Sequence, residues 1–325
     1  MTGTRHHWLD RFFAVALSRP RMFVDGWGDS EVLRRAAEDP DPLGEREGPL
    51  VVRWGDPEPL GRLWARTGAF ESPIPSPPLP AAVRPAHALW VTATRDPGPR
   101  PTWVVLAASG EAGFKRRLQL VGPVVAEGAG AVLLENPYYG LRRPAGQRGT
   151  KVRTVADQLL MNLATIREAL ALVDHLAAAG HTRLGLTGYS MGGHMAAYAA
   201  CHAGRPLAVV PAATGLSAEP IYTEGALSRA VAWDRLGEAP RARLGALLRR
   251  IVETLPPLHA DSRAVLVAAR RDGFVFPEQV EALHARWPGS ELRWVEGGHV
   301  TALVRDAAHI RRAMFDAMAR LEAVC

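Results

Sequence analysis

The sequence predicts an α/β fold with a mostly parallel central sheet, helices on both faces and an inserted lid. From residue 86 onward, short apolar runs alternate with amphipathic segments, which is typical of buried parallel strands joined by helices. The pentapeptide GYSMG at 188–192, centred on Ser190, lies between such a run and a small-residue segment, and this indicates a sharp strand-to-helix turn. Residues 215–257 interrupt the alternation. We interpret them as a lid over the carboxyl ends of the strands, where ligands bind in such sheets.

The first 85 residues form an N-terminal extension of this single domain, which spans 1–325. Residues 8–38 predict two helical pieces separated around Pro20, and residues 50–54 predict a first strand. Residues 66–85 are rich in proline and predict a loop with an extended, polyproline-like path. We expect this loop and the first helix to pack over the body. The alternative for the loop is that it recruits a proline-binding partner. The alternative for the helix is that it contacts a membrane.

The central part of the chain supplies most of the sheet. Strands are predicted at 87–93, 102–108, 131–134, 183–187 and 206–211, and a first helix at 116–127. The clearest helix begins at Thr154, which forms a capping box with Asp157, and ends before Gly180. After the lid, the sequence predicts a strand, a helix, a strand and a closing helix at 264–269, 277–287, 291–295 and 303–321.

Composition describes an ordinary globular protein with a sizeable core: 47% of residues are hydrophobic and 22% are charged. The net charge is +6, and Lys115 and Lys151 are the only lysines. No basic block interleaved with aromatic residues appears, so we expect no nucleic-acid partner. Cys201 and Cys325 are too few for a disulfide framework, and their spacing suits no metal site. We expect Cys201 to lie in the core.

Three residues in the order serine, acid, histidine predict a catalytic triad. A serine hydroxyl becomes a useful nucleophile when a base accepts its proton and a third group orients that base. Asp272 follows the strand at 264–269, and His299 follows the strand at 291–295. We therefore expect Ser190 as nucleophile, His299 as base and Asp272 as acid. Glu219 is an alternative acid, and we expect His194 to be a packed, hydrogen-bonded histidine.

The oxyanion of the reaction needs two backbone amide donors. One should be the amide of Met191, directly after the nucleophile. The other should come from the loop that follows the strand at 102–108, and the amides of Gly110 and Glu111 are the two candidates.

Positive charge at the start of the helix near 116 opposes the helix dipole. Lys115, Arg116 and Arg117 lie there. Ordinary salt bridges are the simpler explanation, and a substrate rim that binds an anionic group is the alternative. Such a rim would also include residues of the next loop: Tyr138, Tyr139, Arg142 and Arg143.

The triad and topology resemble the α/β-hydrolase superfamily, and within it the abhydrolase domain-containing 18 family. The stretches that carry this resemblance are GWG at 26–28, FESP at 70–73, SGEAGFKRR at 109–117, ENPYYGLR at 135–142 and GYSMGGHM at 188–195. The ENPYYG segment is the most specific. The resemblance implies that Ser190, Asp272 and His299 fill the expected catalytic positions. Ser109 and Glu111 stand where the resemblance leads us to expect threonine and aspartate.

These observations predict a cytoplasmic serine hydrolase that cleaves a carboxylic ester through an acyl-enzyme, with no metal or cofactor. A lipid acyl ester is a narrower interpretation, because the aromatic residues of the lid suit an apolar chain and the arginines suit an anionic head group. A thioester or an amide is a less favoured substrate. Two other functions stay open: a non-catalytic scaffold that acts by binding, and an acyltransferase that uses the same triad.

Overall fold

A computed structural model describes residues 6–16, 18–38, 48–74 and 79–323 of the chain. Over these residues the chain forms a ten-stranded sheet in the order β1-β3-β4-β6-β5-β7-β8-β9-β10, with β2 paired to β3. The strands from β6 onward in this order are parallel: β6 (Gly130–Leu134), β5 (Thr102–Leu106), β7 (Leu184–Tyr189), β8 (Ala208–Ala212), β9 (Arg263–Ala269) and β10 (Glu291–Val295). The others run antiparallel to their neighbours: β1 (Arg53–Trp54), β2 (Glu58–Leu60), β3 (Leu63–Glu71) and β4 (Pro85–Thr92). The predicted mixed α/β architecture is confirmed.

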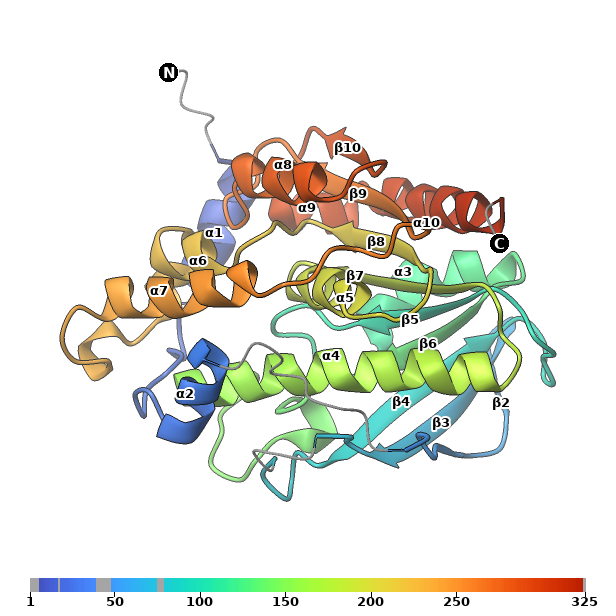
Figure 1. Ribbon diagram of the computed structural model, residues 1–325, viewed down its shortest axis with the longest axis horizontal. Helices are drawn as coiled ribbons and strands as arrows, with labels where there is room; N and C mark the ends of the chain where they lie inside the picture. Colours follow the sequence, from blue (N-terminus) through green and yellow to red (C-terminus); the bar gives the residue numbers. More distant parts are fainter. Residues whose placement is uncertain (1–5, 17, 39–47, 75–78, 324–325) are drawn as a thin grey trace.

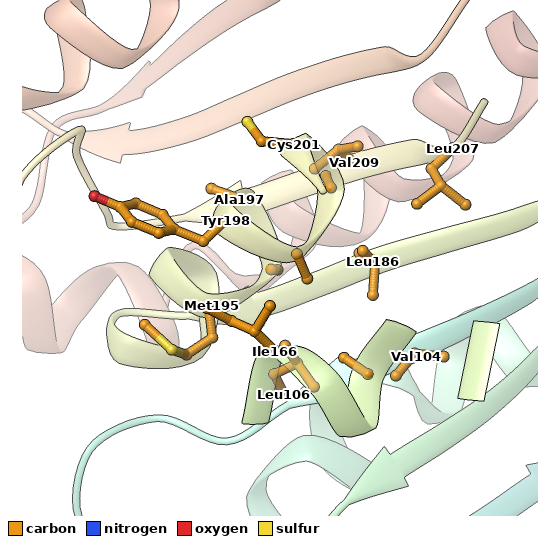
Figure 2. Close-up of a cluster of buried hydrophobic side chains, with 14 of the residues drawn as sticks. Val104, Leu106, Ile166, Leu186, Met195, Ala197, Tyr198, Cys201, Leu207 and Val209 are labelled. Atoms are coloured by element: carbon orange, nitrogen blue, oxygen red, sulfur yellow. The ribbon is translucent and has the colours of Figure 1, made fainter. Parts of the chain in front are cut away.

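Helices cover both faces of the sheet (Figure 1). One face packs against α4 (Val155–Ala178), α5 (Met191–Cys201) and α8 (Pro277–Arg286), and the other against α3 (Lys115–Ala126) and α10 (Ala307–Glu322). Figure 2 shows the first of these cores, which contains Leu106 and Leu186 of the sheet and Met195 of α5. Every residue of β5 and β7 is buried, so these two strands form a fixed base for the loops at their carboxyl ends.

The predicted capping box of α4 is present. The Thr154 hydroxyl accepts a hydrogen bond from the Asp157 amide at 3.0 Å, and the Asp157 carboxylate accepts one from the Thr154 amide at 3.2 Å. These two bonds satisfy amides that have no partner within the helix, and they fix the first residue of this 24-residue helix.

Two predicted segments differ in the structure. The loop predicted at 66–85 contains most of β3, an outer strand of the sheet, and only part of it is a connection. Trp54 of β1 pairs with Gly68 of this strand, and a methyl group on Gly68 would lie 2.5 Å from the Trp54 ring. Glycine therefore stands where the alternation would place a larger side chain, and the strand pattern is lost from the sequence. Residues 75–78 of the proline-rich stretch lie outside the described residues. The closing helix is divided into α9 (His299–Val304) and α10.

The segment predicted as a lid forms a separate group of short helices. These are α6 (Glu219–Thr223), η2 (Ala226–Ala230), η3 (Trp233–Arg235) and α7 (Pro240–Glu253). Figure 1 shows α6 and α7 at one end of the sheet; α1 (Trp8–Ala16) contacts η2, and α2 (Ser30–Glu38) contacts α7. Within the described ranges, no helix has both the length and the apolar character needed to cross a membrane.

Candidate active site

Ser190 lies at a strained turn between β7 and α5. Its backbone has φ +55° and ψ −120°, a conformation that few non-glycine residues adopt. The turn is tight because the chain doubles back against itself: a methyl group on Gly188 would lie 2.4 Å from the backbone of Gly192. A methyl group on Gly192 would lie 2.3 Å from the Leu106 carbonyl oxygen. Glycine at these two positions therefore allows the turn that presents the serine hydroxyl.

The structure brings the three predicted catalytic residues into one hydrogen-bonded chain. The His299 Nε2 atom lies 2.9 Å from the Ser190 hydroxyl, and its Nδ1 atom lies 2.7 Å from the Asp272 carboxylate. Asp272 and His299 are buried, whereas Ser190 is partly exposed. The Ser190 hydroxyl is thus open to the adjoining cavity, and the two groups hydrogen-bonded in line with it are sheltered from water.

Neighbouring groups fix the orientation of the acid and the base. The other Asp272 oxygen accepts hydrogen bonds from the amides of Phe274 and Val275, each at 2.8 Å. The Tyr189 hydroxyl donates to the His299 carbonyl oxygen, and the Phe274 ring lies 4.9 Å from the imidazole. These contacts leave each residue little freedom to rotate away from its partner.

The pKa of His299 reflects two opposing causes. Burial of the imidazole favours the neutral form and lowers the pKa, but the Asp272 and Asp10 carboxylates favour the charged form. The net shift is upward from the ordinary value of 6.5. The histidine is therefore suited to receive a proton during the reaction.

The loop after β5 lines the same cavity as Ser190, but the Glu111 amide of this loop is not available to an oxyanion. The Glu111 amide donates to the Ala108 carbonyl oxygen at 3.1 Å, so it is occupied in a turn and does not face the cavity. Ser109 and Gly110 line the cavity instead, together with Met191 at the start of α5. Gly110 makes only a long 3.5 Å contact from its amide to the Tyr139 hydroxyl. Of the two candidate oxyanion donors, the Glu111 amide is thus already paired, and the Gly110 amide stays a prediction.

Arg117 and Glu111 together support this loop from beneath. The Arg117 side chain is buried, and its Nε atom donates to the Glu111 carboxylate at 3.1 Å. The guanidinium also donates to the carbonyl oxygens of Val105, the residue before the last of β5, and of Leu134, the last residue of the neighbouring β6. Arg117 therefore forms the salt bridge that was the simpler explanation, and the alternative that placed it on a substrate rim is wrong.

Arg142 is likewise an interior residue. Its side chain is 0% exposed and forms a bidentate pair with Glu168 of α4, at 2.6 and 2.7 Å. Tyr138 and Tyr139 are also buried. The alternative that placed these three residues on a substrate rim is therefore wrong: all three are buried, and Arg142 has the buried salt bridge that was the simpler explanation. Of the predicted rim, Arg116 lines the cavity.

The cavity in front of Ser190 has a volume of about 750 Å³. The segment predicted as a lid contributes Ile221, Tyr222 and Leu227 to its wall. No aspartate or glutamate is among the described residues that line it, and its arginine and lysine side chains are Arg116, Lys151, Arg305 and Arg311. Burial lowers the pKa of Lys151. The site thus combines an apolar wall with a positively charged one.

The other residues considered in the sequence have structural roles. His194 packs on Tyr198 with ring centres 4.3 Å apart, and its Nδ1 atom lies 3.2 Å from the Gly215 carbonyl oxygen. Burial lowers the pKa of His194 to about 4, so this ring is neutral near pH 7. Glu219 pairs with Arg249 of α7. Cys201 is buried, as expected, and burial raises the pKa of its thiol to about 11.

Metal ligands are not grouped in the described part of the chain: no three His, Cys, Asp or Glu side chains there are placed to hold an ion.

One residue of the site was not predicted from the sequence. Asp10 of α1 accepts hydrogen bonds from the backbone of both catalytic loops, although it lies more than 250 residues away from them in the chain. No local motif marks it.

A family model described as "Alpha/beta hydrolase domain containing 18" matches residues 20–245 and 248–320. Among solved structures, the acetyl xylan esterase from Paenibacillus sp. R4 superposes with a TM-score of 0.60 at 16% identity, covering 96% of this chain and 99% of that one. Acetyl xylan esterase 1 from Thermoanaerobacterium sp. JW/SL YS485 gives a TM-score of 0.58 at 15% identity, with coverage of 93% and 98%. Brefeldin A esterase, described as a bacterial homologue of human hormone sensitive lipase, gives 0.52 at 12% identity, with coverage of 97% and 94%. At these identities the likeness shows a shared α/β-hydrolase fold.

Proposed function

The chain belongs to the alpha/beta hydrolase domain containing 18 family, and from this premise we propose that it is a serine hydrolase that cleaves carboxylic esters. The observation that carries the proposal is the continuous hydrogen-bonded chain from the Ser190 hydroxyl through His299 to Asp272. The three residues come from the ends of three different parallel strands, in the order expected of a triad on this fold.

In the proposed acylation step, the Ser190 oxygen attacks the carbonyl carbon of the ester while His299 accepts the hydroxyl proton at Nε2. Asp272 holds the imidazole by its other nitrogen and stabilises the positive charge that develops on it. The amide of Met191 and an amide of the loop at 108–110 donate to the oxyanion. The carbon–oxygen bond of the ester then breaks, and His299 returns the proton to the departing alcohol.

Deacylation repeats the same chemistry with water. His299 removes a proton from the water as it attacks the acyl-enzyme, and the second oxyanion occupies the same amides. Collapse of this intermediate breaks the bond to Ser190, which regains its proton, and releases the acid.

The walls of the cavity support a substrate with an apolar acyl part. We propose that residues 215–257 act as the lid, because Ile221, Tyr222 and Leu227 form an apolar wall beside the nucleophile. Arg116 and Lys151, which also line the cavity, would favour an ester that carries a negative group. A panel of esters of graded chain length, neutral and anionic at each length, tests this narrower statement.

The decisive experiment is labelling with a fluorophosphonate probe, read by intact mass. We expect one adduct on the wild-type chain and none on Ser190→Ala, because the probe reacts with an activated serine. Ester hydrolysis by Ser190→Ala should fall on the order of 10⁶-fold in kcat, the scale of the loss when a triad nucleophile is removed.

The two histidines of the cavity provide a matched control. His299→Asn should lose labelling and hydrolysis, whereas His194→Asn should retain both within a few fold, since the His194 imidazole faces the Gly215 carbonyl oxygen and the Tyr198 ring and takes no part in the chain from Ser190 to Asp272. An active Ser190→Ala enzyme, or equal losses in the two histidine variants, would contradict the proposal. Products formed with added alcohol acceptors distinguish hydrolysis from acyl transfer.

A further inference from the structure

A second carboxylate lies next to the triad, and it comes from the N-terminal helix. Asp10 is 1% exposed. Its Oδ2 atom accepts hydrogen bonds from the amides of Gly273 at 2.9 Å and His299 at 2.7 Å, and its Oδ1 atom accepts one from the amide of Val300 at 3.0 Å. Gly273 directly follows the catalytic acid, and the other two amides belong to the base and its neighbour. One side chain thus holds the loops of Asp272 and His299 together.

The glycines beside the two triad residues are adapted to this carboxylate. A methyl group on Gly298 would lie 2.4 Å from His7 Cβ and 2.6 Å from Asp10 Oδ2, and one on Gly273 would lie 3.1 Å from Asp10 Cβ. A real Cβ at Gly298 could not occupy that space without displacing the carboxylate. The backbone at both loops therefore approaches α1 as closely as it does because no side chain stands between them.

Three charge-assisted hydrogen bonds from one buried group are a strong constraint. Hydrogen bonds to an ionised acceptor are shorter and roughly twice as strong as neutral ones. Asp272 and His299 belong to loops after different strands, and their Oδ2–Nδ1 distance is 2.7 Å. An error of about 1 Å in such an alignment can reduce a rate on the order of 10²-fold.

We infer that Asp10 is a positioning residue of the catalytic site, which joins the acid loop to the base loop and makes the N-terminal helix part of the catalytic machinery. This inference rests on the proposed serine hydrolase function. Asp10 does not contact the reacting atoms. It acts through the backbone of residues 273, 299 and 300.

A negative charge at this place also acts on the imidazole. The groups that face His299 are Asp272 from the turn after β9, Asp10 from α1, Ser190 and Tyr189 from the β7 turn, and Phe274. Two of these are carboxylates, and both raise the pKa of His299. Removal of the Asp10 charge should therefore lower that pKa, which a purely mechanical anchor would not do.

The test compares Asp10→Asn and Asp10→Glu with the wild-type chain. Asp10→Asn keeps the size of the side chain but removes its charge, and it replaces one acceptor oxygen by a donor that faces backbone amides. We expect its second-order rate of fluorophosphonate labelling to fall on the order of 10- to 100-fold. Asp10→Glu keeps the charge and shifts the carboxylate by one methylene, so the rate should fall while the pKa of His299 stays near the wild-type value.

The pKa of His299 is measured directly in the full chain by NMR with ¹³C-labelled histidine, and the signal is assigned by its loss in His299→Asn. Asp10→Asn should lower this pKa on the order of one unit, the scale of the effect of a nearby opposite charge. Asp56→Asn is the matched control, because it removes the same charge from an exposed loop beside β1, at the opposite edge of the sheet. It should change neither readout.

The outcomes separate this inference from the proposed function. No adduct on the wild-type chain would contradict the hydrolase function, and the NMR titration would still test the role of Asp10. A wild-type chain that reacts with the probe, together with an Asp10→Asn chain of equal rate and equal His299 pKa, would overturn the inference alone. Should Asp10→Asn not fold, Asp10→Glu carries the test: a wild-type labelling rate in that variant overturns the inference, and a reduced rate with an unchanged pKa supports it.

Discussion

Replacement of Arg142 by methionine should destabilise the fold and not weaken substrate binding. The guanidinium donates to both oxygens of Glu168, to the Val83 carbonyl oxygen and to the Glu135 carbonyl oxygen, all in the interior. Methionine fills much of the space but offers no donor. Arg142→Met therefore leaves the Glu168 carboxylate buried with Ser72 as a remaining hydrogen-bond partner, at 2.5 Å.

The magnitude follows from these partners. Removal of one member of a buried ion pair costs about 3–5 kcal/mol, because the other charge stays buried without compensation. Each carbonyl oxygen that loses its donor adds about 1–3 kcal/mol. Since whole domains are stable by only about 5–15 kcal/mol, the variant should be close to unfolded. Arg142→Met/Glu168→Met removes both charges, so it should recover most of the ion-pair part of the loss.

The assay is urea unfolding followed by circular dichroism, with KM for an anionic ester measured in parallel. The exposed neighbour gives the control: Arg143→Met should change the free energy of unfolding by less than about 0.5 kcal/mol. The reasoning is refuted if Arg142→Met unfolds at the same urea concentration as Arg143→Met and differs only by a higher KM. That result would restore Arg142 to the substrate rim.

Two further predictions concern the triad and its turn. First, kcat/KM should rise with pH and reach half its maximum above pH 6.5, because only neutral His299 accepts the serine proton and its pKa lies above that ordinary value; a midpoint below 6.5 would contradict the assignment. Second, Gly188→Ala should abolish labelling and cost at least about 1–3 kcal/mol in urea unfolding, since the new methyl group would lie 2.4 Å from the Gly192 backbone. Gly122→Ala in α3, where the nearest atom is 3.9 Å away, should leave activity intact, and equal behaviour of the two variants would argue against a steric cause.

The sequence was sufficient for the features that depend on local rules. Residues 184–201 predict a strand, a serine flanked by glycines and a helix, because a tight turn of this kind leaves no room for larger side chains beside the serine. The structure has that turn. The apolar runs placed Asp272 and His299 at the ends of parallel strands, and parallel strands bring their carboxyl ends to one edge. The capping box of α4 was readable because both of its partners lie within one turn of helix.

Only the tertiary structure decided which charged residues face the substrate and which support the site. In a sequence, a buried arginine with a carboxylate partner looks the same as an exposed one, so the choice between a salt bridge and a substrate rim stays open for Arg117 and Arg142; in the structure both form buried salt bridges. Glu168 is 26 residues from Arg142, and Asp10 is 289 residues from the His299 amide that it holds. Periodicity and spacing in a sequence indicate only the contacts that a residue makes with residues close to it in the chain. A pairing between buried charges is set by packing across the whole domain, because burial makes a partner necessary but does not specify where in the chain that partner lies.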